Sequence, residues 1–265
     1  MKVFLTGASS GIGWALAEEF VRRGATVGLV ARRAEKLTHF AAMHPHANIT
    51  LYVVDVTDSA ALQAAANNFM QEHGVPDIVV ANAGISAGSV SGLGDLAVFR
   101  RVMDVNYLGM VSTFEPFVGT MRTHRNGILV GIASVAGVRG LPGAGAYSAS
   151  KAAAMRYLES LRVELRGTGV SVVTIAPGYI RTPMTDHNPY RMPFLMASDA
   201  FAIKAVDAML AKRRFVVLPW PMRLVAMALH VLPRFVYDFA FAKVQRKPRV
   251  SPPSDQTPDK DAPSD

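Results

Sequence analysis

The sequence has no cysteine at any of its 265 positions. Disulfide bonds, thiol nucleophiles and cysteine-bound metals are therefore excluded. The seven histidines are scattered, and no pair has the spacing of metal ligands, so we expect no metal site. No apolar run is long enough for a membrane-spanning helix, and no signal peptide precedes the first strand-like residues. We therefore expect a cytoplasmic location, with association with a membrane as the alternative.

Charge is also sparse, since only 18% of the residues are charged while 50% are hydrophobic. This composition predicts a folded chain, and the length fits one domain with an appendage. The net charge of +8 is concentrated near the C-terminus, where residues 204–249 contain ten Lys or Arg and only two acids. No nucleic-acid-reading motif accompanies this basic region, so we expect no nucleic-acid partner.

Short apolar runs alternate with longer segments of helical periodicity along the chain. This alternation predicts an α/β fold, in which about seven parallel strands form one doubly wound sheet with helices on both faces. We expect the strands at residues 2–5, 25–31, 49–54, 77–81, 127–133, 170–176 and 215–218. In such a sheet a ligand binds outside the carboxyl ends of the strands.

A glycine-rich turn joins the first expected strand to a helical pattern. Its residues are Thr6, Gly7, Ala8, Ser9, Ser10, Gly11, Ile12 and Gly13. Glycines allow a close approach to the backbone, and free amides with the helix dipole attract an anion, so we expect the turn to hold a pyrophosphate. The alternative is a glycine-rich turn that binds nothing.

Two arginines, Arg32 and Arg33, follow the second expected strand, and no acid occupies this position. In a dinucleotide-binding fold a carboxylate here binds the ribose 2′-hydroxyl, whereas an arginine accommodates a 2′-phosphate. Arginine forms bidentate contacts with phosphate, so the sequence favours NADP(H) as cofactor, with NAD(H) as the alternative. A solvated pair of arginines is the other interpretation.

Tyr147 and Lys151 lie four residues apart at the start of a helical pattern, so they share one face of a helix. A lysine ammonium favours the tyrosine phenolate, and we expect the pKa of Tyr147 to fall towards working pH. A tyrosine with such a pKa can pass a proton to or from a substrate oxygen. Taken alone, this short motif also fits an ordinary half-buried tyrosine beside a solvated lysine.

The residues that directly follow the remaining strands are mostly small or polar. They are Asp55, Val56, Asn82, Ala83, Gly84, Ser134, Pro177 and Gly178. Because the carboxyl ends of parallel strands meet at one edge of a sheet, we expect these residues to converge with the glycine-rich turn and Tyr147 in one site.

In this order and spacing, the motifs resemble those of the short-chain dehydrogenase/reductase (SDR) family. The likeness runs from Met1 to about Thr182, with the motifs Thr6-Gly-x-x-x-Gly11-x-Gly13, Asp55, Asn82-Ala-Gly84, Asn106, Ser134, Tyr147-x-x-x-Lys151 and Pro177-Gly178. The resemblance implies a single NADP-binding Rossmann-type domain over residues 1–218, and a homodimer or homotetramer.

The resemblance also implies roles for particular residues. Tyr147 would be the general acid/base, Ser134 would hydrogen-bond the substrate oxygen, and Lys151 would hold the nicotinamide ribose. Asn106, the fourth member of the implied catalytic tetrad, would anchor a water in the proton relay. The implied cofactor contacts are Gly7, Ser9, Ser10, Gly11, Ile12, Gly13, Arg32, Arg33, Asp55, Val56, Asn82, Ala83, Gly84, Tyr147, Lys151, Pro177, Gly178, Ile180 and Thr182.

The C-terminal part divides into three segments. Residues 183–203 carry methionines and aromatics, and we expect either a mobile lid over an apolar substrate or plain core packing. Residues 219–244 are apolar and basic, and Pro233 interrupts them, which predicts a helical extension that does not span a membrane. This extension either lies on an anionic membrane, or packs on the domain or a second subunit. Residues 245–265 predict a disordered tail.

We therefore predict an NADP(H)-dependent oxidoreductase that interconverts a secondary alcohol and a ketone or aldehyde on a largely apolar small molecule. The alternative is a catalytically silent SDR-fold protein that senses the cofactor or acts as a scaffold through its C-terminal segment. The complete tetrad favours the enzyme, since agreement between independent motifs is evidence for a working site. The glycine spacing and short length disfavour an epimerase or dehydratase.

Overall fold

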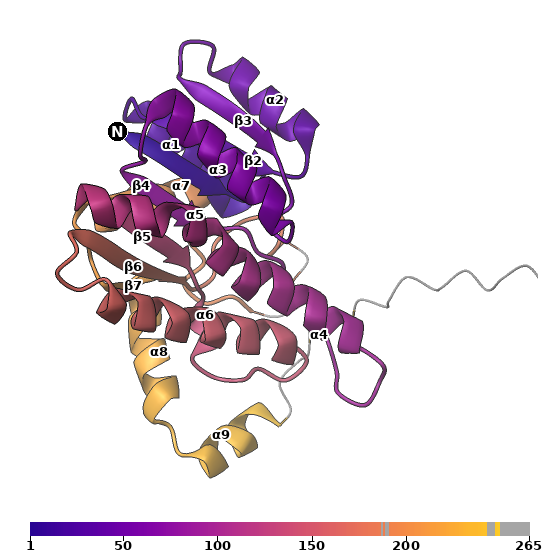
Figure 1. Ribbon diagram of the computed structural model, residues 1–265. Helices are drawn as coiled ribbons and strands as arrows, with labels where there is room; N and C mark the ends of the chain where they lie inside the picture. Colours follow the sequence, from indigo (N-terminus) through magenta and orange to yellow (C-terminus); the bar gives the residue numbers. More distant parts are fainter. Residues whose placement is uncertain (187, 189–190, 243–246, 250–265) are drawn as a thin grey trace, which may run out of the picture.

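The computed structural model describes residues 1–186, 188, 191–242 and 247–249. Seven parallel strands form one sheet in the order β3-β2-β1-β4-β5-β6-β7 (Figure 1). The strands are β1 Lys2–Thr6, β2 Thr26–Ala31, β3 Ile49–Val53, β4 Ile78–Ala81, β5 Gly127–Ile132, β6 Val170–Pro177 and β7 Phe215–Leu218. The predicted doubly wound α/β sheet is confirmed, and each strand boundary agrees with its prediction to within one residue.

Helices connect successive strands and cover both faces of the sheet. They are α1 Gly11–Arg22, α2 Ala34–Met43, α3 Ser59–His73, α4 Leu96–Met103, α5 Gly109–His124, α6 Gly145–Glu164, α7 Ser198–Leu210, α8 Pro221–Val231 and α9 Arg234–Phe241. A π-helical turn, η1 Asp104–Leu108, joins α4 to α5, and a 3₁₀ turn, η2 Val135–Gly137, follows β5.

Two apolar cores lie on opposite faces of the sheet, because successive side chains of a strand point to opposite sides. On β1, Val3 and Leu5 belong to the core that includes residues of α1, α2 and α7. Phe4 belongs to the other core, with its ring centroid 4.9 Å from that of Phe117 and 5.6 Å from that of Phe69. Full burial of such a ring contributes about 1.5–3 kcal/mol, so both faces stabilise the sheet.

The order of the strands reverses at β1, which has β2 on one side and β4 on the other. A reversal of this kind opens a crevice at the carboxyl ends of the strands. At this point the buried hydroxyl of Thr6 donates to the carbonyl of Val80 and accepts from the N–H of Asn82 at 3.2 Å. The end of β1 is thereby fixed to the end of β4, beside the glycine-rich turn.

The predicted lid, residues 183–203, is divided in the structure into a loop and the first residues of α7, which begins at Ser198. Phe201 and Ala202 are buried in the core, and α7 packs against α1. Residues 198–203 of the predicted lid are therefore part of a core helix, which leaves 183–197 for that role. Residues 187 and 189–190 of this segment lie outside the described residues.

The C-terminal extension consists of α8 and α9, which project from the β7 edge of the sheet (Figure 1). No single helix in the described part of the chain is long and apolar enough to cross a membrane. Among the helices of the described residues, α8 and α9 reach that length and composition only as a pair, and they are bent by 117° at a break that contains Pro233. Residues 243–244 of the predicted extension are not among the described residues.

The predicted disordered tail, residues 245–265, includes a short segment that packs on the domain. Arg249 pairs with Gly88 in a parallel β-bridge and forms an ion pair with Asp95 at 2.7 Å. The prediction of disorder is wrong for residues 247–249, because composition does not reveal a distant carboxylate that binds the segment. The rest of the tail lies outside the described residues.

Candidate active site

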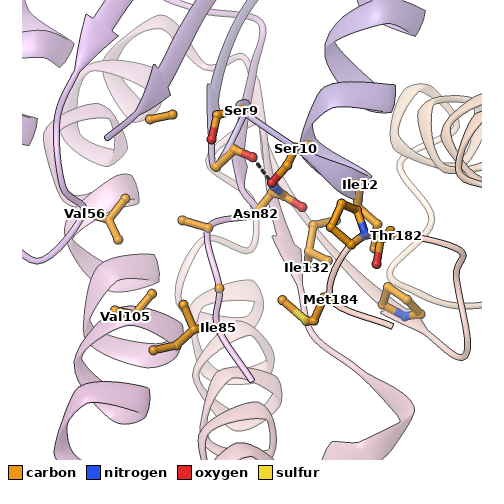
Figure 2. A pocket seen from close by; sticks show the side chains of 18 of the residues that line it. Ser9, Ser10, Ile12, Val56, Asn82, Ile85, Val105, Ile132, Thr182 and Met184 are labelled. Carbon is orange, nitrogen blue, oxygen red and sulfur yellow. Dashed lines mark hydrogen bonds between the residues drawn. The ribbon is translucent and has the colours of Figure 1, made fainter. Parts of the chain in front are cut away.

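A cleft of about 400 Å³ opens at the carboxyl ends of the central strands. Figure 2 shows how Ser9 and Ser10, Ile85 and Val105, and Thr182 with Met184 surround it. Its lining includes every residue expected to contact a cofactor, from Gly7 to Thr182, together with Ser134. Asn106 is the one member of the expected site that does not line the cleft.

The lining also contains residues that the motifs do not include. These are Val30, Ala31, Val54, Ile85, Val105, Ile132, Ala133, Pro183, Met184 and Thr185. All of them lie within a few positions of an expected site residue, and this proximity in the sequence was a signal that could have identified them.

The glycine-rich turn has no room for a side chain at Gly7 or Gly13. Gly7 has a φ of 72°, and a Cβ there would lie 2.7 Å from the Cα of Ala83. A Cβ on Gly13 would lie 2.1 Å from the carbonyl oxygen of Gly7. Ser10 precedes α1 in an extended conformation and makes no side-chain capping bond, so the amides at the start of the helix are open to an anion. This cradle fits a pyrophosphate.

Arg32 and Arg33 lie at the adjoining end of the cleft, beyond β2. The Arg33 guanidinium donates to the hydroxyl of Ser9 at 2.9 Å and to that of Ser10 at 2.8 Å. Arg32 donates to Asp55 at 3.4 Å. Two exposed guanidinium groups therefore stand next to the glycine-rich turn, where they can bind a phosphate.

Asp55 is held between charged and polar groups rather than free in the cleft. Its carboxylate accepts bonds from the N–H and hydroxyl of Thr57, and from Arg101 at 3.1 Å. Burial raises the pKa of Asp55, but the bonds from Thr57 and Arg101 outweigh it and hold the pKa below its usual value. Arg101 comes from α4, and no feature of the sequence pointed to it.

Lys151 is almost completely buried on α6. Its ammonium donates to the carbonyl of Ile132 at 2.8 Å and lies 6.0 Å from the centroid of the Tyr147 ring. Burial lowers the pKa of Lys151 to about 8. The lysine therefore changes charge close to neutral pH, beside the tyrosine.

The pKa of Tyr147 differs from the prediction. Burial raises it above its ordinary value, and a hydrogen bond with Ser134 lowers it only in part. The predicted fall is wrong because desolvation disfavours the phenolate more than the neighbouring groups favour it. The same desolvation weakens the charge of Lys151, on which the prediction depended.

Ser134 follows β5 and has two structural partners. Its hydroxyl accepts the N–H of Ala136 at 3.1 Å, which caps η2, and it is bonded to Tyr147. The residue is thus both the strand-end turn residue and a hydrogen-bond partner of the tyrosine in the cleft.

Asn106 lies behind the cleft, in the π-helical turn η1, and is fully buried. Its amide accepts the N–H of Ile85 at 2.8 Å and donates to the carbonyl of Ile85 and the hydroxyl of Ser150, both at 2.9 Å. The side chain therefore ties the loop after β4 to α6. A role in anchoring a water stays a prediction.

Comparison with known proteins agrees with this arrangement. The short chain dehydrogenase family model matches residues 1–191. An uncharacterized oxidoreductase from Myxococcus xanthus is 36% identical over 244 residues, which cover 91% of this chain and 96% of that protein.

Solved structures share the fold over most of the chain. A short-chain dehydrogenase/reductase from Burkholderia phymatum, in complex with NAD, has a TM-score of 0.80 at 22% identity, with coverage of 94% of this chain and 97% of that one. L-Sorbose reductase from Gluconobacter frateurii, in complex with NADPH and L-sorbose, has a TM-score of 0.73 at 24% identity, with coverage of 82% and 94%. The chain thus belongs to the short-chain dehydrogenase family, and it is an oxidoreductase that acts on CH–OH groups with a nicotinamide cofactor.

Proposed function

We propose that this protein is an NADP(H)-dependent oxidoreductase that interconverts a secondary alcohol and a ketone or aldehyde on a largely apolar small molecule. The observation that carries the proposal is a single cleft lined by the glycine-rich turn, Arg33 and the Ser134–Tyr147–Lys151 group. Met184 brings an apolar, adaptable side chain to the same cleft, which favours an apolar substrate.

The preference for NADP(H) rests on Arg33. The similar folds from Burkholderia phymatum and Gluconobacter frateurii were solved with NAD and with NADPH, so the fold alone does not decide the cofactor. Arg33 is already bonded to Ser9 and Ser10, beside the pyrophosphate cradle. A guanidinium at this place binds a 2′-phosphate, and NADH has none.

The variant Arg33→Ala tests this preference. A hydrogen bond to a charged group contributes about 1.5–3 kcal/mol, so the KM for NADPH should rise about 10- to 100-fold while the KM for NADH stays the same. Arg213→Ala, an exposed arginine just before the amino end of β7, is the matched control. An equal rise for both cofactors would contradict the assignment of Arg33 to the 2′-phosphate.

The chemistry assigned to the chain is proton transfer and orientation. When bound, the nicotinamide cofactor supplies or accepts the hydride. In reduction, Tyr147 donates its phenolic proton to the substrate oxygen, and its raised pKa keeps that proton in place at neutral pH. The Ser134 hydroxyl forms hydrogen bonds with Tyr147 and with the substrate oxygen, and it thereby keeps the two groups next to each other. Lys151, charged below about pH 8, stabilises the phenolate that remains.

The direct test is oxidation of NADPH and NADH by the purified protein with a panel of ketones and aldehydes, with Tyr147→Phe alongside. General acid catalysis contributes about 10²- to 10⁴-fold, so the variant should lose at least 100-fold in kcat and bind NADPH unchanged. Near-normal turnover in the variant would exclude the mechanism. NADPH binding by the wild type without reduction of any carbonyl would favour the scaffold alternative.

A second, independent observation concerns the outer face of the extension. Six large apolar side chains there are 56–88% exposed: Trp220, Leu224, Met227, Val231, Phe235 and Phe239. Exposed arginines, Arg223 and Arg234, lie beside them. We propose that this apolar face docks on an anionic membrane surface, because an apolar helix face flanked by cations is typical of interfacial helices.

Sedimentation with vesicles tests the docking. We expect the protein to sediment with vesicles of phosphatidylserine and phosphatidylcholine but weakly with phosphatidylcholine alone, and less in high salt. Leu224→Ser combined with Phe235→Ser should abolish sedimentation and leave NADPH binding unchanged. If light scattering instead finds a dimer that these substitutions dissociate, a second copy covers the face and the proposal fails.

A further inference from the structure

The C-terminal extension of α8 and α9, together with residues 247–249 of the following segment, contacts three loops that carry or adjoin the catalytic groups. These are the loop after β6, which begins at Gly178, the 135–144 loop after Ser134, and the 86–95 loop after Ile85. The first two contacts are made by different residues of the extension and the third by residues 247–249, so the three can be considered one at a time.

The first contact lies at the base of α8. A Cβ on Gly178 would lie 2.6 Å from the Cγ of Met222, so only a glycine allows this approach. Met222 also packs with Val135, which follows Ser134 directly. The start of the extension therefore supports two strand ends that line the cleft.

The second contact is made by Arg139, five positions after Ser134. Its guanidinium donates to the carbonyl of Leu229 at 2.8 Å and to that of Leu232, at the C-terminal end of α8. It also lies 4.9 Å from the centroid of the Tyr237 ring on α9. Tyr237 in turn donates its hydroxyl to the carbonyl of Gly140. Arg139 thus holds both helices of the extension to one loop.

The third contact is the segment of residues 247–249. Arg249 donates to both oxygens of Asp95, at 2.7 and 2.9 Å, and the side chain of Asp95 is fully buried. Lys247 donates to the hydroxyl of Ser86 at 2.7 Å. A Cβ on Gly88 would lie 2.0 Å from the carbonyl oxygen of Pro248, so the backbones are in close contact.

The 86–95 loop connects this segment to the reacting groups. Its first residue, Ser86, follows Ile85, which lines the cleft. Further along, Ser89 pairs with Ala144 and accepts the N–H of Ala146, the residue before Tyr147. The segment of residues 247–249 is therefore linked through this loop to the neighbours of Ile85 and Tyr147, two residues that line the cleft.

We propose that the Asp95–Arg249 ion pair fastens residues 247–249 across the 86–95 loop and thereby fixes the outer wall of the substrate site. Asp95 and Arg249 are then positioning residues that determine the selectivity for bulky apolar carbonyls. This inference rests on the proposed function, because it concerns the substrate of the same cleft. A small carbonyl that does not reach the wall is not affected by it.

The test compares Arg249→Gln, Arg249→Lys and Asp95→Asn with the wild type on small and bulky ketones. We expect Arg249→Gln and Asp95→Asn to raise the KM for bulky ketones about tenfold, as for the loss of a charge-assisted contact. The kcat and the KM for small ketones and for NADPH should stay the same, and Arg249→Lys should restore part of the effect. Arg166→Gln, an exposed arginine just beyond the far end of α6, is the matched control.

Three results would overturn the proposal. The first is an unchanged KM for bulky ketones in Arg249→Gln, the second is an equal rise for small and bulky ketones, which would indicate general damage, and the third is unchanged hydrogen exchange of residues 86–95. Hydrogen exchange of residues 86–95 measures the fastening without turnover, and it should be faster in Arg249→Gln but not in Arg166→Gln. If the wild type reduced no carbonyl, the proposed function would fail. If hydrogen exchange of residues 86–95 were the same in Arg249→Gln as in the wild type, the ion pair would not fasten this loop and the present proposal would fail.

Discussion

Replacement of Lys151 by methionine should stabilise the folded protein while it abolishes turnover. Burial lowers the pKa of Lys151 from 10.5 to about 8. Each pKa unit corresponds to about 1.36 kcal/mol, so the charged lysine costs the folded state about 3 kcal/mol at neutral pH. Methionine removes this cost but also loses the hydrogen bond from the charged ammonium to the carbonyl of Ile132, which contributes about 1.5–3 kcal/mol. We expect the free energy of unfolding at pH 7 to rise by about 1 kcal/mol.

The stability that Lys151→Met gains over the wild type decreases as the pH rises, because the pKa of Lys151 is lowered in the folded state. Below about pH 8, Lys151 is charged in both the folded and the unfolded state, and the full cost is present. As the pH rises from about 8 towards 10.5, the folded state releases the proton while the unfolded state keeps it. The wild type therefore gains stability over this range, and the advantage of Lys151→Met shrinks.

Urea unfolding followed by circular dichroism, at pH 7 and at about pH 9.5, measures both effects. Lys36→Met, on the exposed side of α2, is the control, and its difference from the wild type should not change between the two pH values. A Lys151→Met protein that is less stable than the wild type at pH 7 would refute the reasoning. So would an advantage that is equally large at both pH values.

Three further substitutions test the packing behind the cleft. Gly131→Ala should lower the free energy of unfolding by about 1–3 kcal/mol in urea titrations, because its Cβ would lie 2.4 Å from Leu158; an unchanged midpoint would contradict this contact. Phe114→Ala, at a fully buried position on α5, should cost about 3–5 kcal/mol, and a loss below 1 kcal/mol would mean that the site is not core. Asn106→Ala leaves the N–H and carbonyl of Ile85 without their partner, so the melting temperature should fall by an amount that corresponds to about 2 kcal/mol or more. An unchanged melting temperature would contradict the role of Asn106 in linking the loop after β4 to α6.

Much of the fold was predictable because its signals are local. Each strand is a short apolar run that ends in a glycine, proline or polar residue, and this pattern located all seven strands. The parallel topology then places the strand ends together, so the convergence of Asn82, Ser134 and Gly178 at the cleft followed from the order of the elements. The glycine-rich turn was identifiable for the same reason, since its position between β1 and α1 is local.

The remaining features depend on contacts between distant residues, which a local pattern does not contain. Asp55 meets Arg101, 46 positions away, and Asp95 meets Arg249, 154 positions away. The pKa of Tyr147 was predicted in the wrong direction, because the sequence shows the neighbouring lysine but not the degree of burial. Burial is a property of the whole packed chain.

The contacts of Arg33 with Ser9 and Ser10 also have a consequence for the entropy of nucleotide binding. A long side chain that becomes ordered in a complex loses rotational freedom, which costs about 0.5–1.5 kcal/mol. Here the two serine hydroxyls already restrict the guanidinium in the folded protein, so most of this loss occurs during folding and not during association. Removal of either hydroxyl would weaken the binding of a phosphate by returning freedom to the arginine, with the arginine itself unchanged.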